Sequence, residues 1–114
     1  MHGACIVDED GRMTIREDIG RHNAVDKIIG WGFLENKLPF DSHVLLVSGR
    51  ASFEILQKSL AARIPIICAV SAPSSLAVDL ARKAGVTLLG FLREGRFNVY
   101  AHPSRLRATA GHHG

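Results

Sequence analysis

The sequence of 114 residues has few cysteines and few aromatic residues, and it contains no long apolar run. Its two cysteines, Cys5 and Cys68, do not form a C-x-x-C pair, which excludes a zinc ribbon and a redox dithiol. No stretch approaches the roughly 18 apolar residues of a membrane span. The first ten residues lack the basic start and apolar centre of a secretory signal peptide. We therefore expect a cytoplasmic protein with no membrane span and with two buried thiols.

Strong charge of one sign is also missing. The net charge is +3, and it is spread too evenly for a DNA-binding stripe, so we expect no nucleic-acid partner. Arginine greatly outnumbers lysine, and guanidinium groups suit phosphate and carboxylate ligands. The chain has no G-x-x-x-x-G-K-[ST] motif, which excludes a P-loop. It also lacks H-x-E combined with P-C-x-x-C, which excludes a zinc deaminase site.

Hydrophobic periodicity predicts strands alternating with helices. Helices are expected from a cap at Asn23 to a point between 30 and 36, and over 51–62 and 74–85. Short apolar runs and one "EDG" turn indicate the strands, which we place at 4–8, 12–16, 43–48, 64–70, 86–92 and 97–100. Buried strands that alternate with helices favour a single α/β domain with a mixed sheet.

Four polar clusters follow the predicted strands: "EDIGRHN", "SGRAS", "SAPSS" and "REGR". In an open α/β sheet such clusters share the edge at the carboxyl ends of the strands, where ligands bind. Helix N-termini, glycines and arginines there suit an anion. The candidate residues are Asp18, Arg21, Ser48, Gly49, Arg50, Ser71, Arg93 and Arg96. The alternative is that each cluster is only a loop with a helix cap.

The roles of two residues near the first cluster stay open. Asp18 has the chemistry to bind a ribose hydroxyl or a guanine N–H edge, but such residues more often pair with a local arginine or cap a turn. His22 with Asp18 would suit a hydrolase as base and orienting acid, although a histidine at a helix start is more often structural.

Two long blocks, "REDIGRHNAVDKIIG" and the segment from "SGRASFEIL" to "HPSRL", resemble the C-terminal part of the formate dehydrogenase accessory sulfurtransferase family, FdhD. The resemblance runs from about His2 to Leu106. It implies a three-layer α/β/α sandwich with a mixed sheet, similar to cytidine deaminases but without their zinc chemistry. We accordingly expect a cofactor-binding domain at residues 1–106 and a frayed tail at 107–114.

The resemblance also implies a function. Members of the family carry sulfur from a cysteine desulfurase to the molybdenum cofactor, bis(molybdopterin guanine dinucleotide), before formate dehydrogenase receives it. GDP is the expected analogue of that cofactor, and a homodimer is expected because the family tends to pair. The family's cofactor-binding segment corresponds here to Phe91, Leu92, Arg93, Glu94, Gly95 and Arg96.

The sequence departs from the family pattern in one respect. The family's sulfur carrier is a C-x-x-C pair that lies before a "GG-x-H" stretch, and this sequence begins at about the histidine of that stretch, His2. We therefore expect this chain to bind the cofactor without transferring sulfur by itself, and we assign neither Cys5 nor Cys68 as carrier. The alternative is a nucleotide-binding or regulatory module that has no sulfur-transfer activity.

Overall fold

The computed structural model of the chain describes residues 1–106, apart from the side chains of Arg21 and His22. The expected tail, residues 107–114, lies outside the described part of the chain. The elements are, in order, β1 (His2–Val7), β2 (Met13–Asp18), α1 (Arg21–Leu34), β3 (Val44–Val47), α2 (Phe53–Ala61), β4 (Ile66–Ala69), α3 (Ser75–Ala84), β5 (Thr87–Arg93) and β6 (Arg96–Ala101). Every strand and helix that the periodicity predicts is present, with bounds that differ by a few residues.

The strands form one six-stranded sheet in the order β2-β1-β3-β4-β5-β6. β3, β4 and β5 run parallel, whereas β1 is antiparallel to both of its neighbours and β6 is antiparallel to β5. The predicted α/β fold with a mixed sheet is therefore confirmed. The parallel strands are short apolar runs, as expected for strands at the centre of a sheet.

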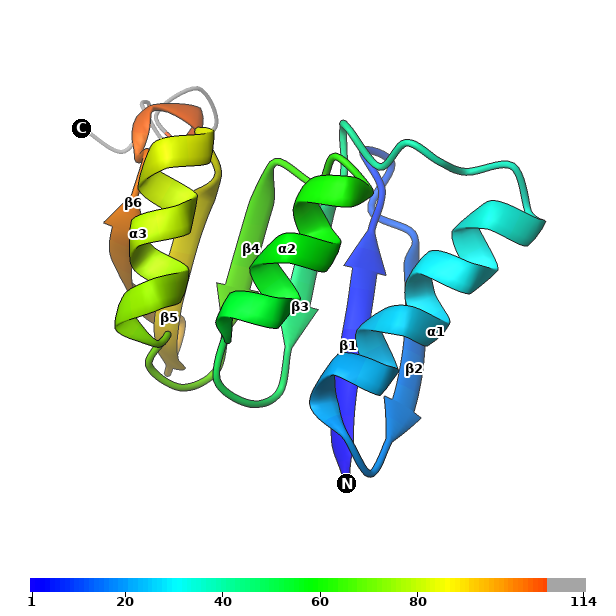
Figure 1. Cartoon of the computed structure of the whole chain (residues 1–114), viewed down its shortest axis with the longest axis horizontal. Helices are drawn as coiled ribbons and strands as arrows, with labels where there is room; N and C mark the ends of the chain where they lie inside the picture. Colours follow the sequence, from blue (N-terminus) through cyan, green and yellow to red (C-terminus); the bar gives the residue numbers. More distant parts are fainter. Residues whose placement is uncertain (107–114) are drawn as a thin grey trace.

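All three helices lie on the same face of the sheet (Figure 1). The connections β2–α1–β3, β3–α2–β4 and β4–α3–β5 all advance in the same direction across the sheet. Because such connections are right-handed, they place their helices on the same face. The core lies between the helices and the sheet, and its fully buried members include Ile28, Leu45, Ile55 and Leu88. The described residues thus form one helical layer and one sheet layer, and the second helical layer of the expected sandwich is not formed by them.

Within residues 1–106, no helix covers the opposite face of the sheet, and a row of apolar residues crosses that face. Strand register places Ile15 beside Cys5, Cys5 beside Leu46, and Leu46 beside Cys68. A shallow apolar cavity of about 230 Å³ opens there, lined in part by Cys5, Ile15 and Leu46. Cys68 is buried, as expected, but Cys5 is only partly buried. The expectation for Cys5 was wrong because its outer neighbour on this face, Ile15, is itself exposed, whereas Cys68 lies between Leu46 and the buried Leu89.

Helix ends follow local side-chain chemistry at two of the three helices. The hydroxyls of Ser52 and Ser74 accept hydrogen bonds from the third residue beyond each, and Gly85 ends α3 with a φ of 77°. α1 differs from the prediction, because it begins at Arg21 with Gly20 as its cap residue and no side-chain cap. The side chain of Asn23, the expected cap, instead donates to Asp18.

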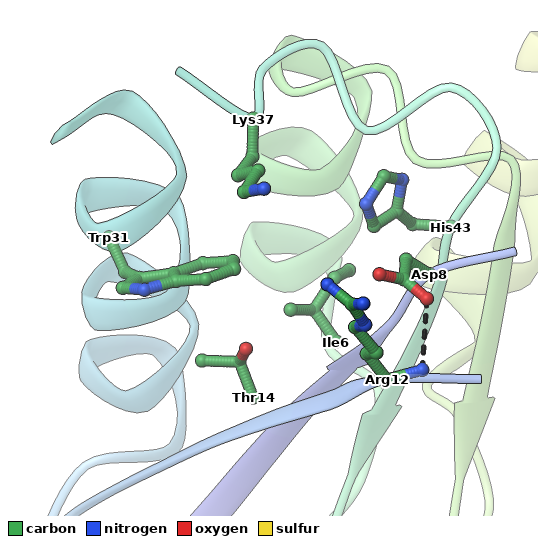
Figure 2. A pocket seen from close by; sticks show the side chains of 7 residues that line it. All are labelled: Ile6, Asp8, Arg12, Thr14, Trp31, Lys37 and His43. Atoms are coloured by element: carbon green, nitrogen blue, oxygen red, sulfur yellow. Dashed lines mark hydrogen bonds between the residues drawn. The ribbon is translucent and has the colours of Figure 1, made fainter. Parts of the chain in front are cut away.

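The loop between α1 and β3 is anchored by Phe40, whose side chain is fully buried. Its ring fills the space above Gly32, where an added Cβ would lie 2.3 Å from Phe40 Cζ. Its backbone N–H donates to the carbonyl of Ala62 at 2.9 Å. This anchor fixes the wall of a cavity at the amino-terminal end of β3, at the opposite end of the strand from Ser48 (Figure 2).

Candidate functional site

The four polar clusters lie along one edge of the sheet, as the strand order predicts. β2, β3, β4 and β5 all end at this edge, which is the lower edge in Figure 1, and the three helices begin there. Helix N-termini present unpaired backbone N–H groups and a positive partial charge. We call this region the carboxyl edge. It comprises Asp18–Gly20, Ser48–Ser52, Ser71–Ser75 and Phe91–Arg96.

Direct hydrogen bonds join the central clusters of the carboxyl edge. Ser48 Oγ accepts from the backbone N–H of Gly3 at 2.8 Å, which ties the end of β3 to the start of β1. Arg50 Nε donates to the carbonyl oxygen of Ala72 at 3.1 Å. The backbone N–H of Phe91 donates to the carbonyl oxygen of Ser71 at 3.4 Å. The loop after β3 therefore contacts the loop after β4 through Arg50, and the loop after β4 contacts the base of the β5–β6 hairpin through Ser71.

The tip of the β5–β6 hairpin concentrates positive charge. Glu94 and Gly95 both have positive φ, 51° and 77°, which is the geometry of a two-residue hairpin turn. Arg93 and Arg96 are register partners directly across this turn, and both are exposed. Like charges directly opposite one another on a hairpin repel. An anion held between the two guanidinium groups would remove that repulsion and accept hydrogen bonds from both.

The base of the hairpin is held by close packing. A Cβ added at Gly90 would lie 2.9 Å from both Pro73 Cδ and Tyr100 Cε2, so β5 can approach the loop after β4 only with glycine at this position. The next residue, Phe91, has a φ of 55°, and the pairing of β5 with β6 is irregular between Gly90 and Arg93. Residues other than glycine rarely adopt a positive φ, and backbone strain of this kind is concentrated at functional sites.

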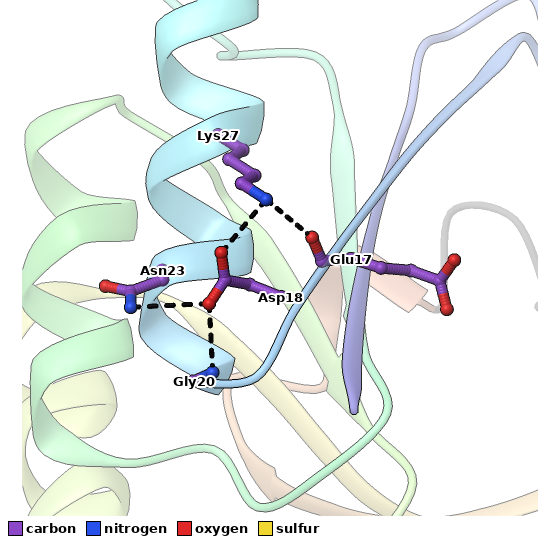
Figure 3. A network of polar contacts seen from close by, with 5 residues as sticks. All are labelled: Glu17, Asp18, Gly20, Asn23 and Lys27. Atoms are coloured by element: carbon purple, nitrogen blue, oxygen red, sulfur yellow. Dashed lines mark hydrogen bonds and ion pairs between the residues drawn. The ribbon is translucent and has the colours of Figure 1, made fainter.

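Asp18 is committed to a structural network at the start of α1 (Figure 3). Its carboxylate lies 2.9 Å from Lys27 Nζ and accepts from the backbone N–H of Gly20 at 3.1 Å and from Asn23 Nδ2 at 3.4 Å. The hydrogen bond from Lys27, followed by the one from Gly20, lowers the pKa of Asp18 to about 2. Local pairing, one of the two roles left open for Asp18, is thus the one observed.

The structure also separates Asp18 from the hairpin. β2 and β5 stand four positions apart in the sheet, which corresponds to about 19 Å at the usual strand spacing. Asp18 and the hairpin tip therefore cannot both contact one phosphate group. The side chains of Arg21 and His22 lie outside the described part of the chain, so the predicted roles of both residues stay predictions.

The two thiols are poorly suited to nucleophilic chemistry. Burial raises the pKa of Cys5 and that of Cys68, which lowers the thiolate fraction at neutral pH. Both lie in the same cross-strand row with Leu46 between them, a separation of about 10 Å, or two strand spacings. That distance is too long for a disulfide.

Some candidate residues at the other end of the molecule were not predicted from the sequence. Arg12, Lys37 and His43 meet around the cavity at the amino-terminal end of β3, although Arg12 comes from the β1–β2 turn and the other two come from the α1–β3 loop. A histidine just before a buried strand and a lysine just after a helix are the only signals in the sequence. Neither signal indicates that the two residues meet.

These features define an α/β protein whose mixed sheet places loops rich in arginine and serine at the carboxyl ends of its parallel strands. Residues 1–107 match the sequence model of the FdhD/NarQ family, and the chain belongs to that family. Among the described residues, no helix combines the length and the apolar character needed to cross a membrane.

Relatives with known names support this assignment. The chain is 59% identical over 111 residues to a protein of Nocardia farcinica named sulfur carrier protein FdhD, covering 96% of this chain and 40% of that protein. A protein of Mycobacterium tuberculosis with the same name is 57% identical over 107 residues, covering 93% of this chain and 39% of that protein. The chain thus spans about two fifths of the length of the curated relatives it matches.

A solved structure is also similar. It is the crystal structure of a protein from Desulfotalea psychrophila, described as a candidate formate dehydrogenase accessory protein. The TM-score is 0.82 and the sequences are 36% identical, over 91% of this chain and 46% of that one. The resemblance read from the sequence is confirmed.

Proposed function

We propose that this chain holds the guanine nucleotide end of a molybdenum cofactor while a sulfur carrier of the FdhD/NarQ family adds sulfur to that cofactor. The observation that carries this proposal is the pairing of Arg93 with Arg96 across the hairpin tip, because side chains of directly opposed residues leave the same face of a hairpin and both residues are exposed. Two guanidinium forks match the oxygens of a diphosphate. Bis(molybdopterin guanine dinucleotide) is the proposed client, and GDP is the smallest fragment of it that carries this recognition.

Each part of the carboxyl edge has a role in the proposal. Arg93 and Arg96 hold the diphosphate, and Gly95 keeps the backbone of the turn open to it. Arg50 is anchored through Nε to the loop after β4, and its two terminal nitrogens make no hydrogen bond with a described residue. The exposed ring of Phe91, with 40% of its surface accessible, offers a face on which a guanine base can stack.

In this proposal, sulfur transfer is performed by a thiol of a longer FdhD/NarQ family protein and not by a thiol of this chain. A persulfide carrier needs an accessible, activated thiolate, whereas the pKa values of Cys5 and Cys68 are raised. We propose that neither thiol of this chain carries sulfur. The partners are a cysteine desulfurase as donor and formate dehydrogenase as recipient, in the cytoplasm. A homodimer is also proposed, supported by exposed Met13 and Ile15 on the helix-free face.

Calorimetric titration with GDP tests the binding proposal. We expect saturable binding to the wild-type chain, and we expect Arg96→Ala to weaken it about tenfold, because one charge-assisted hydrogen bond contributes about 1.5–3 kcal/mol. Arg63→Ala is the matched control, since Arg63 is an exposed arginine that precedes β4 at the opposite edge. Equal affinity of the wild-type chain and Arg96→Ala for GDP would contradict the proposed binding site.

A mass measurement tests the proposal for the thiols. The chain is incubated with a cysteine desulfurase and cysteine, and its intact mass is recorded. No persulfide adduct is expected on either thiol. A stable persulfide on Cys5 would contradict the proposal and would favour a sulfur-carrying role for the helix-free face.

A further inference from the structure

A second polar cavity lies at the opposite end of β3 from the carboxyl edge. It has a volume of about 140 Å³, which is room for a small ion together with water. Three segments enclose it: the β1–β2 turn, the second half of α1 and the loop that precedes β3 (Figure 2). Its lining residues are Ile6, Asp8, Arg12, Thr14, Trp31, Lys37 and His43.

The walls of this cavity are fixed by the buried ring of Phe40. Trp31 stacks on Phe40 with ring centroids 6.5 Å apart, and Phe40 contacts the ring of His43 with centroids 4.8 Å apart. Backbone hydrogen bonds hold the residues on either side. The backbone N–H of Lys37 donates to the carbonyl oxygen of Gly32 at 2.7 Å, and the backbone N–H of His43 donates to the carbonyl oxygen of Phe40 at 3.2 Å. Lys37 and His43 therefore enter the cavity from a backbone that the core positions.

Neither cationic side chain of the cavity lies within 4 Å of a carboxylate of a described residue. The side chains of Arg12 and Lys37 make no hydrogen bond and no ion pair of 4 Å or less with any residue that the structure describes. The imidazole of His43 also makes no hydrogen bond through its ring nitrogens within the described part of the chain, and its Nδ1 is buried. Buried polar atoms in folded proteins nearly always have a partner, and His43 Nδ1 is the atom of this lining to which that rule applies, because Arg12 and Lys37 are exposed to solvent. A polar occupant of the cavity would supply the partner that His43 Nδ1 lacks among the described residues.

The single carboxylate of the lining, Asp8, offsets only part of this positive charge. Asp8 Oδ1 accepts hydrogen bonds from the backbone N–H groups of Asp10 and Arg12, both at 2.9 Å. The bond from Arg12 is the main reason that the pKa of Asp8 is lowered, and the charges of Arg12 and His43 contribute to lowering it. Asp8 is thus bound to its own turn, and Figure 2 shows Arg12, Lys37 and His43 reaching toward a common space.

We propose that this cavity is a second anion site, which binds a small oxyanion of the phosphate or carboxylate kind. Arg12 supplies a two-pronged guanidinium contact, Lys37 supplies a point charge, and the hydroxyl of Thr14 supplies a neutral donor. Ile6 and Trp31 form the apolar wall against which the ion lies. The site does not rest on the function proposed for the carboxyl edge, because the two regions share no residue.

Trp31 makes this proposal directly testable, because it is the only tryptophan of the chain and it lines the cavity. The full chain is titrated with inorganic phosphate, with acetate and with sodium chloride at matched ionic strength. We expect a saturable change in tryptophan fluorescence in the millimolar range for phosphate, acetate or both, and none for chloride. Comparing the phosphate titration with the acetate titration shows whether the site prefers a phosphate or a carboxylate.

Two variants and one control define the site. Arg12→Gln and Lys37→Gln are each expected to raise the half-saturation concentration about tenfold. Arg63→Gln, which alters an exposed arginine outside the cavity, is expected to leave it unchanged. The thermal midpoint is a second readout, because a ligand that binds the folded chain raises it.

Two results would overturn the proposal. One is a response that chloride reproduces or that the double variant Arg12→Gln/Lys37→Gln retains. The other is the absence of both a fluorescence change and a rise in midpoint up to tens of millimolar of either oxyanion.

Discussion

The two ends of the sheet use arginine in different ways. At the carboxyl edge Arg50 braces neighbouring loops through Nε, and Arg93 and Arg96 face each other at a hairpin tip that projects into solvent. At the amino-terminal end, Arg12 and Lys37 converge on an enclosed cavity from separate segments. The first arrangement is open and suits part of a large ligand. The second is small and suits a single ion.

The comparison shows that the carboxyl edge follows from the order of strands and loops in the sequence, whereas the cavity depends on tertiary packing. Every part of the carboxyl edge lies at the end of a strand or just after it, so the topology alone brings these parts together. The cavity depends on one long-range anchor, the ring of Phe40 above Gly32. It should therefore be the more fragile of the two to a core substitution.

The largest expected effect comes from Gly32→Ala. The new Cβ would lie 2.3 Å from Phe40 Cζ, so the ring must move and take the α1–β3 loop with it. We expect the free energy of unfolding to fall by about 1–3 kcal/mol. We also expect the phosphate response of Trp31 to weaken while GDP binding is retained. Chemical denaturation and the two titrations measure these effects.

Gly30→Ala is the matched control for this change. Gly30 lies in the same helix, and no atom lies within 4 Å of a Cβ added there. Alanine at that position should raise the free energy of unfolding by roughly 0.5–1 kcal/mol, because glycine is a poor helix former. If the two variants lowered stability equally, the anchoring role of Phe40 would be wrong.

A smaller effect is expected at the carboxyl edge from Arg50→Ala. The change removes the hydrogen bond from Nε to Ala72, which should lower the free energy of unfolding by about 0.5–1.5 kcal/mol. It also removes two terminal nitrogens that we place near the diphosphate, so GDP affinity should fall as well. Denaturation and calorimetry separate the two losses. An unchanged GDP affinity would assign Arg50 to bracing alone.

The smallest expected effect is the pH dependence contributed by Asp18. Its pKa of about 2 in the folded chain lies below the value of about 3.9 for an unfolded aspartate. Its stabilising contribution is therefore fully present above about pH 4 and is lost as the pH falls through about 2. Asp18→Asn should lower the thermal midpoint at pH 7 but not at pH 2.

Asp79→Asn provides the comparison for this titration. Asp79 is exposed on α3 and makes no ion pair within the described part of the chain. Its replacement should leave the midpoint nearly unchanged at both pH values. A midpoint difference for Asp18→Asn that did not depend on pH would contradict the role of its charge in holding Lys27.

The sequence predicted the elements and the carboxyl edge because both depend on near neighbours in the chain. Ser74 and Gly85 act through residues within one helical turn, and the hairpin turn at Glu94–Gly95 depends on two residues only. The start of α1 was misplaced because Asn23 bonds to Asp18, five residues earlier, rather than to the helix. Rules that predict helix caps from local sequence do not account for the competing hydrogen bond to Asp18.

Other features required knowledge of distant contacts. The partial exposure of Cys5 depends on its neighbours in the adjacent strands, among them the exposed Ile15, and the pattern of β1 does not reveal this. The cavity requires Phe40 to reach Gly32 and the hydrogen bond to Ala62 that holds the loop. The salt bridge of Lys58 with Asp26, at 2.7 Å, likewise joins two helices that are distant in sequence.

The most direct test of the central claim is to map GDP onto the chain by amide chemical shifts in nuclear magnetic resonance. The account predicts that the shifts concentrate in Ser48–Arg50, Ser71 and Phe91–Arg96, with the amides of Trp31 and His43 unchanged. Shifts that are absent at the hairpin, or that concentrate at the amino-terminal cavity, would contradict the assignment of the carboxyl edge as the nucleotide site.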